Sequence, residues 1–292
     1  MKKTTMTAAL CALMVGAVPA MAQGTAGATT AAAMSQDELT FELLEKGESP
    51  RRELRYDLSA RTEVTEVKDS TDRKMTMNGQ PGPGSMLEET VIATVEVRAP
   101  EGGLSKLVIS GEPKGTAEGW LAKGDTYIAT VNGSGHVTKI EAHGGSGSEG
   151  DLDSIRSLAV RLPDEAVGVG ASWRETRIIR ESGIRAEISY TRTITAIRGD
   201  VIEIETTGFA ALTHTGEPLE GVPPTVTLES LSGEGEITGK ATIDLAHLLP
   251  RESMESGDIA LNIAMSMGGA QAMKIAQTVV GKKTTERIDA AG

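Results

Sequence analysis

The four histidines are the first residues to consider for metal binding or acid–base chemistry. His136 and His143 lie seven residues apart on one expected strand, so they point to opposite faces of it and cannot bind the same ion. His214 in an expected loop and His247 in an apolar run have no second ligand at metal-binding spacing. The sequence therefore predicts structural histidines, with no metal site and no cofactor.

Serine nucleophiles and paired carboxylates are the other candidates for catalysis. The Gly-x-Ser-x-Gly pattern of a nucleophile elbow is absent from the sequence, and Ser146 lies in a flexible Gly/Ser-rich run. Glu203 and Glu205 alternate with apolar residues, which places both on the wet face of a strand. Glu63 and Glu66 form no glycosidase signature. We therefore expect no catalytic residue and no enzyme.

Methionines form two pairs that could bind a soft ion. Met75 with Met77, and Met265 with Met267, are each spaced to project from one side of an extended segment. Thioether pairs can bind Cu(I), but no histidine or cysteine accompanies either pair. Methionine is also an adaptable filler of cores and apolar clefts, and we favour that interpretation over copper binding.

Strands must position most of these residues, because apolar and polar residues alternate over long stretches. The alternating runs are 54–64, 91–97, 184–197 and 201–205. Such runs predict long antiparallel strands with one apolar and one polar face. The connections at 131–136 and 197–201 are too short for a crossover helix, so each predicts a hairpin.

Helical patterns are sparse. Apolar residues recur at helical spacing over 151–162, with Asp151 or Asp153 as the N-cap and Pro163 as the stop. A weaker helical pattern over 268–280 contains two glycines and β-branched residues, and it favours a loop followed by a strand.

The fold class that follows is mainly β: a curved antiparallel sheet, half-barrel or clam-like, in two similar halves with one or two short helices. Only 2% of the residues are aromatic and 34 are Gly, so the strands can bend and leave space that a flat sheet could not fill. An outer-membrane barrel is the alternative, but aromatic girdles are missing and many outward positions are charged. The predicted segments are a signal peptide at 1–22, a flexible leader at 23–37, a first β half at 38–143, a Gly/Ser linker with a short helix at 144–162, and a second β half at 163–289.

The N-terminus indicates export. Two lysines precede the apolar stretch 6–18, and residues 20–22 match a small-x-small cleavage signal, so we expect cleavage before Gln23. Cys11, the only cysteine, lies inside the apolar stretch, where it is badly placed for lipid attachment. The expected product is periplasmic or extracellular, does not span the membrane, and has neither a disulfide nor a thiol.

The charge excludes one class of partner. The chain of 292 residues has a formal net charge of −12, and the signal peptide would remove two lysines and no acid. Such an acidic protein repels polyanions, and its few aromatic side chains offer few platforms for stacking bases. We therefore expect no nucleic-acid partner.

Five short motifs follow one another along the chain and carry a resemblance to a known family. They are Lys74-Met75-Thr76-Met77, Leu162-Pro163, Val169-Gly170-Ala171-Ser172-Trp173, Gly233-x-Gly235 and Met265-Ser266-Met267. In this order they resemble a bacterial family of exported β-rich proteins catalogued as a domain of unknown function, over roughly residues 38–289. The resemblance implies a basic, methionine-rich loop at the first motif. It also implies a curved sheet similar to periplasmic lipoprotein-carrier half-barrels, with no catalytic residue.

Two function classes stay open. The first is a binding or carrier module for an apolar ligand such as a lipid, and the second is a structural or protein-interaction component of the cell envelope. A carrier needs a lined, semi-open cavity, whereas an interaction protein needs only a filled core. The expected ligand contacts on the apolar strand face are Leu54, Tyr56, Leu58, Val91, Ala93, Val95 and Tyr190, together with Ile188, Ile202 and Ile204, and with Met265 and Met267 near the opening.

The intact mass of the protein purified from its own cell envelope tests the export prediction. We expect a chain that starts at Gln23 and carries no acyl group, because the cleavage signal is sound and Cys11 is misplaced. A mass that retains residues 1–22, or includes a diacylglycerol on Cys11, would contradict this expectation.

Overall fold

The computed structural model describes residues 39–114, 124–143, 149–181, 183–216, 226–267 and 273–288. The predicted signal peptide, the leader, the glycines at 268–269 and the first part of the linker lie outside these described residues. The described elements, in chain order, are β1 (Leu39–Glu45), β2 (Arg61–Met77), β3 (Gln80–Pro81), β4 (Ser85–Val97), β5 (Leu104–Lys114), β6 (Thr126–Asn132), β7 (Val137–His143), α2 (Glu149–Arg156), β8 (Ser172–Glu181), β9 (Ile184–Arg198), β10 (Val201–His214), β11 (Val226–Asp244), β12 (Glu252–Met267) and β13 (Met273–Ile288).

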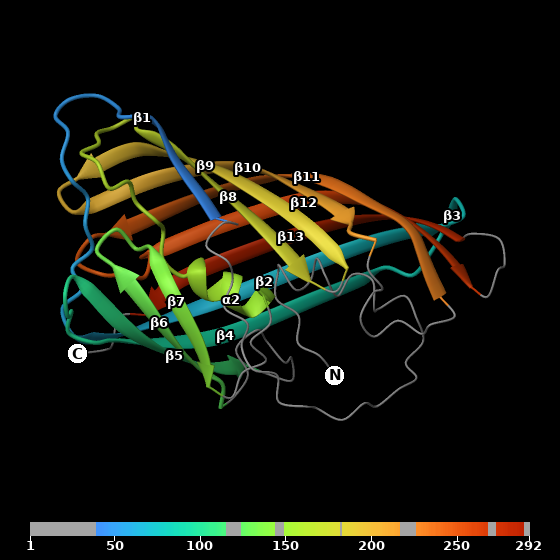
Figure 1. The fold of residues 1–292 in the computed structure, drawn as a ribbon, viewed down its shortest axis with the longest axis horizontal. Helices are drawn as coiled ribbons and strands as arrows, with labels where there is room; N and C mark the ends of the chain where they lie inside the picture. The colour runs from blue at the N-terminus through green and yellow to red at the C-terminus, as the bar shows by residue number, and fades with distance from the viewer. Residues whose placement is uncertain are drawn as a thin grey trace.

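All thirteen of these strands belong to one antiparallel sheet, which confirms the predicted fold class. The strand order is β1-β8-β9-β10-β11-β12-β13-β2-β4-β5-β6-β7, with β3 paired to β2. Figure 1 shows the sheet curving from β1 round to β7, with α2 on its inner side. Within the described residues, β1 and β7 are edge strands that do not pair with each other, so the sheet is open. The described part of the chain contains no helix that is long and apolar enough to cross a membrane.

The two chain halves share this sheet. The last strand, β13, pairs with β2 along fourteen residue pairs, from Ile275 with Met77 to Ile288 with Val64. The first strand, β1, leaves its own half and pairs with β8. The segment at 144–162 therefore divides the chain but not the sheet.

The hairpin predictions are confirmed, and one strand prediction is wrong. β6 pairs with β7, and β9 pairs with β10 around the turn at 199–200. The predicted strand over 54–64 begins only at Arg61. Its first part cannot pair along one neighbour, because the amide of Tyr56 donates to the carbonyl of Gly133 at 2.8 Å while the amide of Asp57 donates to the carbonyl of Leu245 at 2.7 Å.

The predicted helix is shorter than 151–162. α2 ends at Arg156, because the chain turns back so that the amide of Leu162 donates to the carbonyl of Ser134 at 2.8 Å. The apolar residues of the helical pattern still enter the core: they are Leu152, Ile155, Leu158, Ala159 and Leu162. The strand expected at 273–280 forms the first part of β13.

Two loop predictions also need correction. Residues 74–77 are not a loop, since they are the last residues of β2 and pair with β13. His214 is the last residue of β10 and pairs with Ile184. In both places the neighbouring strand is long enough to continue the backbone hydrogen bonding of the sheet. The pairing therefore extends beyond the residues in which apolar and polar side chains alternate.

The buried side chains of the inner face form two clusters. The first joins the start of β2 and strands β4 to β6 with α2, Trp173 and the β11–β12 connection. The second lies further along β8 to β13 and contains Ile188, Leu212, Leu261 and Met265 among its members. Half-buried Met75 and Met77 pack against the second cluster.

Glycines allow the sheet to bend where β11 meets β12. A Cβ on Gly235 would lie 2.2 Å from the carbonyl oxygen of Asp258 and 2.5 Å from Cγ1 of Ile259. A Cβ on Gly233 would lie 2.3 Å from a methyl carbon of Leu261. Only glycine lets the two strands approach this closely, so these positions set the curvature that forms the inner face.

Replacing Trp173 tests the first cluster. Its side chain is fully buried at the start of β8, as the sequence predicts, and it is the largest member of the cluster. Trp173→Ala should lower the free energy of unfolding by about 3–5 kcal/mol, the usual cost of emptying an aromatic core site. Denaturation in urea measures this loss. Phe209→Ala is the control, because Phe209 is 45% exposed and its removal should cost less than about 0.5 kcal/mol. An unchanged midpoint for Trp173→Ala would contradict the assignment.

Candidate functional site

A cavity of about 130 Å³ opens on the inner face, between the two clusters. Strands β8 to β13 and β2 form its floor and sides, and the segment from α2 to Val160 lies over one edge. The apolar part of the lining comes from the second cluster: Ile188, Ala210, Ile237, Ile259 and Val279. The polar part includes Arg177, Tyr190, Arg192, Thr206, Glu255 and Lys283.

The cavity exists because facing positions on its floor carry no side chains. Gly257 on β12 pairs directly with Gly281 on β13, and both line the cavity. Gly239 on β11 lines it as well. Side chains on one face of a sheet normally fill the space above it, so paired glycines leave a hollow above the backbone.

A buried ion cluster forms the β8–β9 side of the cavity. Glu175 accepts a hydrogen bond from Nε of Arg177 at 2.6 Å and another from Nη1 of Arg192 at 3.2 Å. Both guanidinium groups also lie over the ring of Tyr190, 5.7 and 5.1 Å from its centroid. Burial alone would raise the pKa of Glu175, but the two guanidinium groups outweigh it and lower the pKa to about 2. Glu175 is therefore charged at any physiological pH.

A row of charged side chains crosses the other side of the floor. Four charged residues occupy opposite positions on neighbouring strands. In the strand register, Glu89 on β4 lies opposite Asp69 on β2. Asp69 lies opposite Lys283 on β13, and Lys283 lies opposite Glu255 on β12. Asp69 and Glu89 are only 9% and 8% exposed, and Oδ1 of Asp69 has no hydrogen-bond partner. Burial raises the pKa of Asp69 to about 6. Burial and then the charge of Asp69 raise the pKa of Glu89 to about 7.

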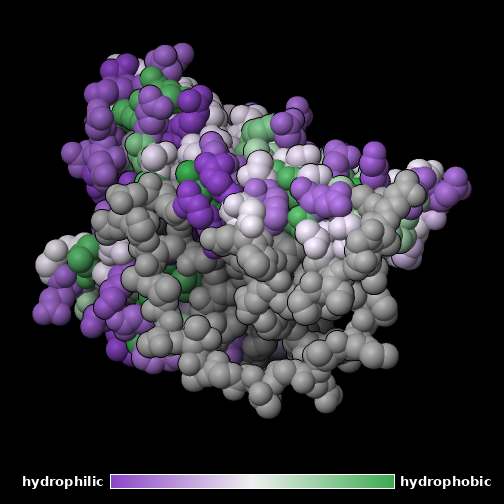
Figure 2. Space-filling view, turned by 45° about the vertical axis from the view of Figure 1, so that its right-hand side comes forward, coloured by the Kyte–Doolittle hydropathy of each residue, from purple (hydrophilic) through white to green (hydrophobic). Residues whose placement is uncertain are grey.

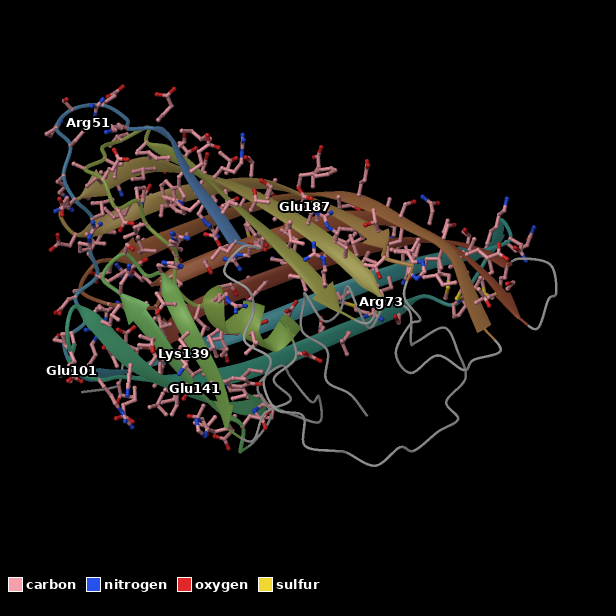
Figure 3. All side chains as sticks on the ribbon, in the orientation of Figure 1. Arg51, Arg73, Glu101, Lys139, Glu141 and Glu187 are labelled. Carbon is pink, nitrogen blue, oxygen red and sulfur yellow. The ribbon has the colours of Figure 1, made fainter. Side chains whose placement is uncertain are left out.

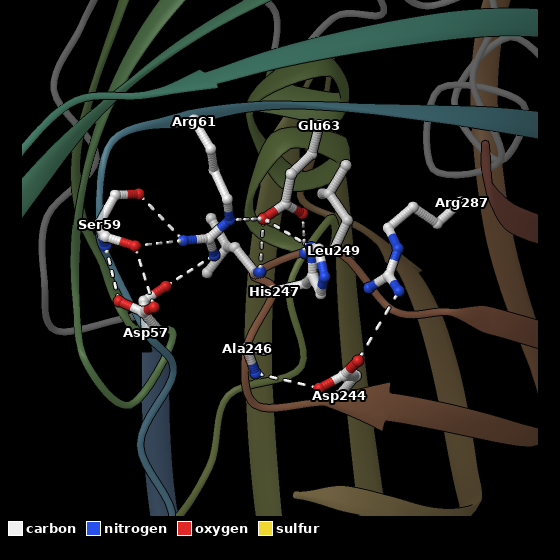
Figure 4. A network of polar contacts seen from close by, with 10 residues as sticks. Asp57, Ser59, Arg61, Glu63, Asp244, Ala246, His247, Leu249 and Arg287 are labelled. Carbon is white, nitrogen blue, oxygen red and sulfur yellow. Dashed lines mark hydrogen bonds and ion pairs between the residues drawn. The ribbon is translucent and has the colours of Figure 1, made fainter. Parts of the chain in front are cut away.

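Glu63 anchors the β11–β12 connection beside the first cluster. Its carboxylate accepts hydrogen bonds from the amides of Leu248 and Leu249 at 2.9 and 2.8 Å, and from Nε of Arg61 at 2.6 Å (Figure 4). Nδ1 of His247 lies 3.7 Å from the same carboxylate. The side chain of Glu63 is 1% exposed, and its carboxylate is bound by two backbone amides and a guanidinium group, so Glu63 has a structural role.

The residues expected to contact a ligand are divided between the clusters and the cavity. Leu54, Tyr56, Leu58, Val91 and Val95 lie in the first cluster with Ile202 and Ile204, and Ala93 is also fully buried. Ile188, Tyr190 and Met265 lie in the second cluster. Only Ile188 and Tyr190 of this set line the cavity. The side chain of Met267 lies outside the described residues, and ligand contact by the remaining positions stays a prediction.

The sequence analysis missed the charged and glycine residues of the cavity. One signal was available: Glu175 and Arg177 alternate in phase with Trp173 and Ile179, which places both charges on the buried face of β8. The Gly257–Gly281 pair had no such signal, because its register exists only in the assembled sheet. Among the described residues, no group of three or more His, Cys, Asp or Glu could hold a metal ion.

The outer face of the sheet differs from this interior. Ion pairs lie along it, such as Lys139 with Glu141 on β7 (Figure 3) and Lys240 with Glu205 at 2.8 Å. In the view of Figure 2, the coloured surface is mostly hydrophilic, with small hydrophobic patches. These ion pairs lie on exposed positions, where solvent screens them.

No family model and no curated protein matches this chain. Several solved structures share limited similarity with it. The outer membrane protein OprG from Pseudomonas aeruginosa is 7% identical with a TM-score of 0.23, and the alignment covers 80% of this chain and 98% of OprG. A mutant of the Rh. blastica porin is 10% identical with a TM-score of 0.20, covering 77% and 100%. OpdQ from Pseudomonas aeruginosa is 7% identical with a TM-score of 0.22, covering 79% and 98%. Similarity at this level carries no argument about fold or function.

The buried carboxylates predict an unusual dependence of stability on pH. The folded state raises the pKa values of Asp69 and Glu89, so the stabilisation from their protonation is complete below about pH 4 and is lost as the pH rises through 6 and 7. We expect the free energy of unfolding to fall by on the order of 4 kcal/mol between pH 5 and pH 8 as these two carboxyl groups ionise. Urea denaturation of the wild type and of the double variant Asp69→Asn, Glu89→Gln measures the difference.

Two other groups must be separated from this effect. Burial lowers the pKa of His136 below its usual value of 6.5, so the stability that this group contributes is lost as the pH falls, in the opposite direction to the carboxyl groups. The comparison with the double variant cancels this contribution. The contribution of Glu175 is lost only as the pH falls from about 4.5 toward 2. Glu88→Gln, an exposed neighbour on β4, serves as the control. Identical pH profiles for the wild type and the double variant would show that the two carboxylates are not buried.

Proposed function

We propose that this protein is a non-catalytic, exported binding module that holds an apolar or amphiphilic small molecule, such as a lipid, in the cavity of its inner face. The observation that carries this proposal is the hollow above Gly257 and Gly281, which is bordered by five aliphatic side chains of the second cluster. An open sheet that curves around a lined cavity is the arrangement that a carrier needs.

The size of the cavity restricts the ligand. Its volume of about 130 Å³ is close to that of an engineered apolar cavity of roughly 150 Å³ that binds benzene. It therefore accommodates part of one hydrocarbon chain, and each methylene it buries contributes roughly 0.8 kcal/mol. We infer that a ligand enters it with one hydrocarbon chain or one aromatic ring, while the rest of the molecule extends from the opening.

The alternative is a structural or protein-interaction component of the envelope. The tightly packed first cluster would serve that role as well, since it is filled with side chains. The cavity favours the binding module, because a protein that acts only through its edges has no need for paired glycines on a buried floor. The signal-like N-terminus supports a periplasmic or extracellular location for either function.

A neutral fluorescent probe tests the proposal. N-phenyl-1-naphthylamine should gain fluorescence on titration with the full chain, with a micromolar dissociation constant. Gly281→Leu places a side chain in the hollow and should weaken binding at least tenfold. The matched control is Thr278→Leu, which adds the same side chain to the exposed face of β13. No fluorescence gain with the wild type would reject the proposal.

A second variant tests the same cavity in case Gly281→Leu does not fold. Ser253→Leu also narrows the cavity, from a half-buried lining position on β12. Circular dichroism and the urea midpoint establish whether each variant folds. A folded Ser253→Leu or Gly281→Leu protein that binds the probe as tightly as the wild type would locate binding elsewhere and contradict the assignment of this cavity.

A further inference from the structure

At the β8–β9 side of the cavity, two guanidinium groups share one carboxylate. Two guanidinium groups, those of Arg177 and Arg192, are paired with the single carboxylate of Glu175. The side chains of Arg177 and Arg192 are 7% and 11% exposed, so solvent screens this charge poorly. A third guanidinium, that of Arg161, also acts on Glu175 while it stacks on the ring of Phe41 at 4.3 Å.

Arg192 is the member of this cluster with unused hydrogen-bonding capacity toward the cavity. A guanidinium carries five N–H groups, and within the described residues Arg192 donates to Glu175 through Nη1 only. None of its nitrogens is both fully buried and unpaired, and Arg192 lines the cavity, so its remaining N–H groups stay accessible beside the cavity. A buried cation with free donors beside a cavity is a site for an anionic group.

The opposite side of the cavity has the opposite character. Glu255 lines it on β12, and Asp69 lies behind Lys283 in the same cross-strand row. β12 is three strand spacings from β9, which is about 14 Å along the sheet. The cavity therefore has one end, at the arginines, that attracts an anionic group. The acidic residues at the other end repel such a group.

We infer that the cavity binds an anion-headed, single-chain amphiphile, with a carboxylate as the head group at Arg192 and the hydrocarbon chain along the aliphatic lining. This inference rests on the proposed function and specifies its ligand class. The chain begins at Ile188, which directly precedes Tyr190 on the inner face of β9, and continues over Ala210 and Ile237 toward Ile259. Bidentate contact with a guanidinium suits a planar carboxylate better than a hydroxyl group.

Competition between matched ligands tests this inference. Dodecanoate and dodecanol share one chain length and differ in the charge of the head group. Each is titrated against the full chain loaded with N-phenyl-1-naphthylamine at pH 7.5, below their critical micelle concentrations. We expect dodecanoate to displace the probe at an at least tenfold lower concentration than dodecanol, because the acid forms a charge-assisted pair with Arg192. Dodecyltrimethylammonium should compete more weakly than either.

Variants of Arg192 locate the head group. Arg192→Gln should reduce the preference for dodecanoate over dodecanol to about one while dodecanol still competes, and Arg192→Lys should restore part of it. Arg185→Gln is the matched control, because Arg185 is on the other face of β9, where it pairs with Glu187 at 2.7 Å. Arg185→Gln should keep the wild-type preference.

The outcomes separate the two proposals. Equal competition by dodecanoate and dodecanol with the wild type would overturn the anion site and leave the binding module intact. Displacement of the probe by none of the three ligands would contradict the ligand class altogether, and failure of the probe itself to bind would reject the proposed function. A preference that persists in folded Arg192→Gln protein would place the head group away from Arg192 and overturn the inference.

Discussion

The structure depends on one constraint: within the described residues, a single open sheet has to bury its inner face without a second sheet to cover it. It meets this constraint by curving, so that side chains from distant strands converge. Curvature requires strands that approach closely, and Gly233 and Gly235 make this approach between β11 and β12. With few aromatic side chains to fill the enclosed space, the interior divides into two apolar clusters with a cavity between them.

The same curvature explains why charged residues lie inside. In a long strand every second residue faces the inner side of the sheet. In the described strands, aliphatic residues fill only part of these inward positions, and polar or charged residues occupy the others. Charges at these positions are costly unless they are paired. Glu63 meets this requirement with backbone amides and Arg61, and so fixes the β11–β12 connection. Glu175 meets it with the guanidinium groups of Arg177 and Arg192, at the border of the cavity.

The cavity and the charged groups together support the proposed binding function. Glu175 is held as an anion by its arginines, and Asp69 and Glu89 lie at the far side of the floor, on β2 and β4. The open space between them is bordered by aliphatic residues and glycines together with a similar number of polar and charged residues. The proposed function and its ligand class rest on this combination of aliphatic and charged lining residues.

The sequence alone determined the local features, because each depends on neighbours in the chain. Period-two alternation predicted strands in the places of β4, β9 and the start of β10, and short connections predicted both hairpins. The burial of Trp173 followed from its place at the start of a strand. The resemblance to an exported family stays a prediction. The extent of 54–60 and of α2 was decided by hydrogen bonds to Gly133, Leu245 and Ser134, which no local pattern contains. Tertiary structure also decided the site. Strand order and register bring Gly257 to Gly281 and Arg192 to Glu175, and separate most of the expected contact residues from the cavity, because pairing between distant strands is set by the whole sheet rather than by any one segment.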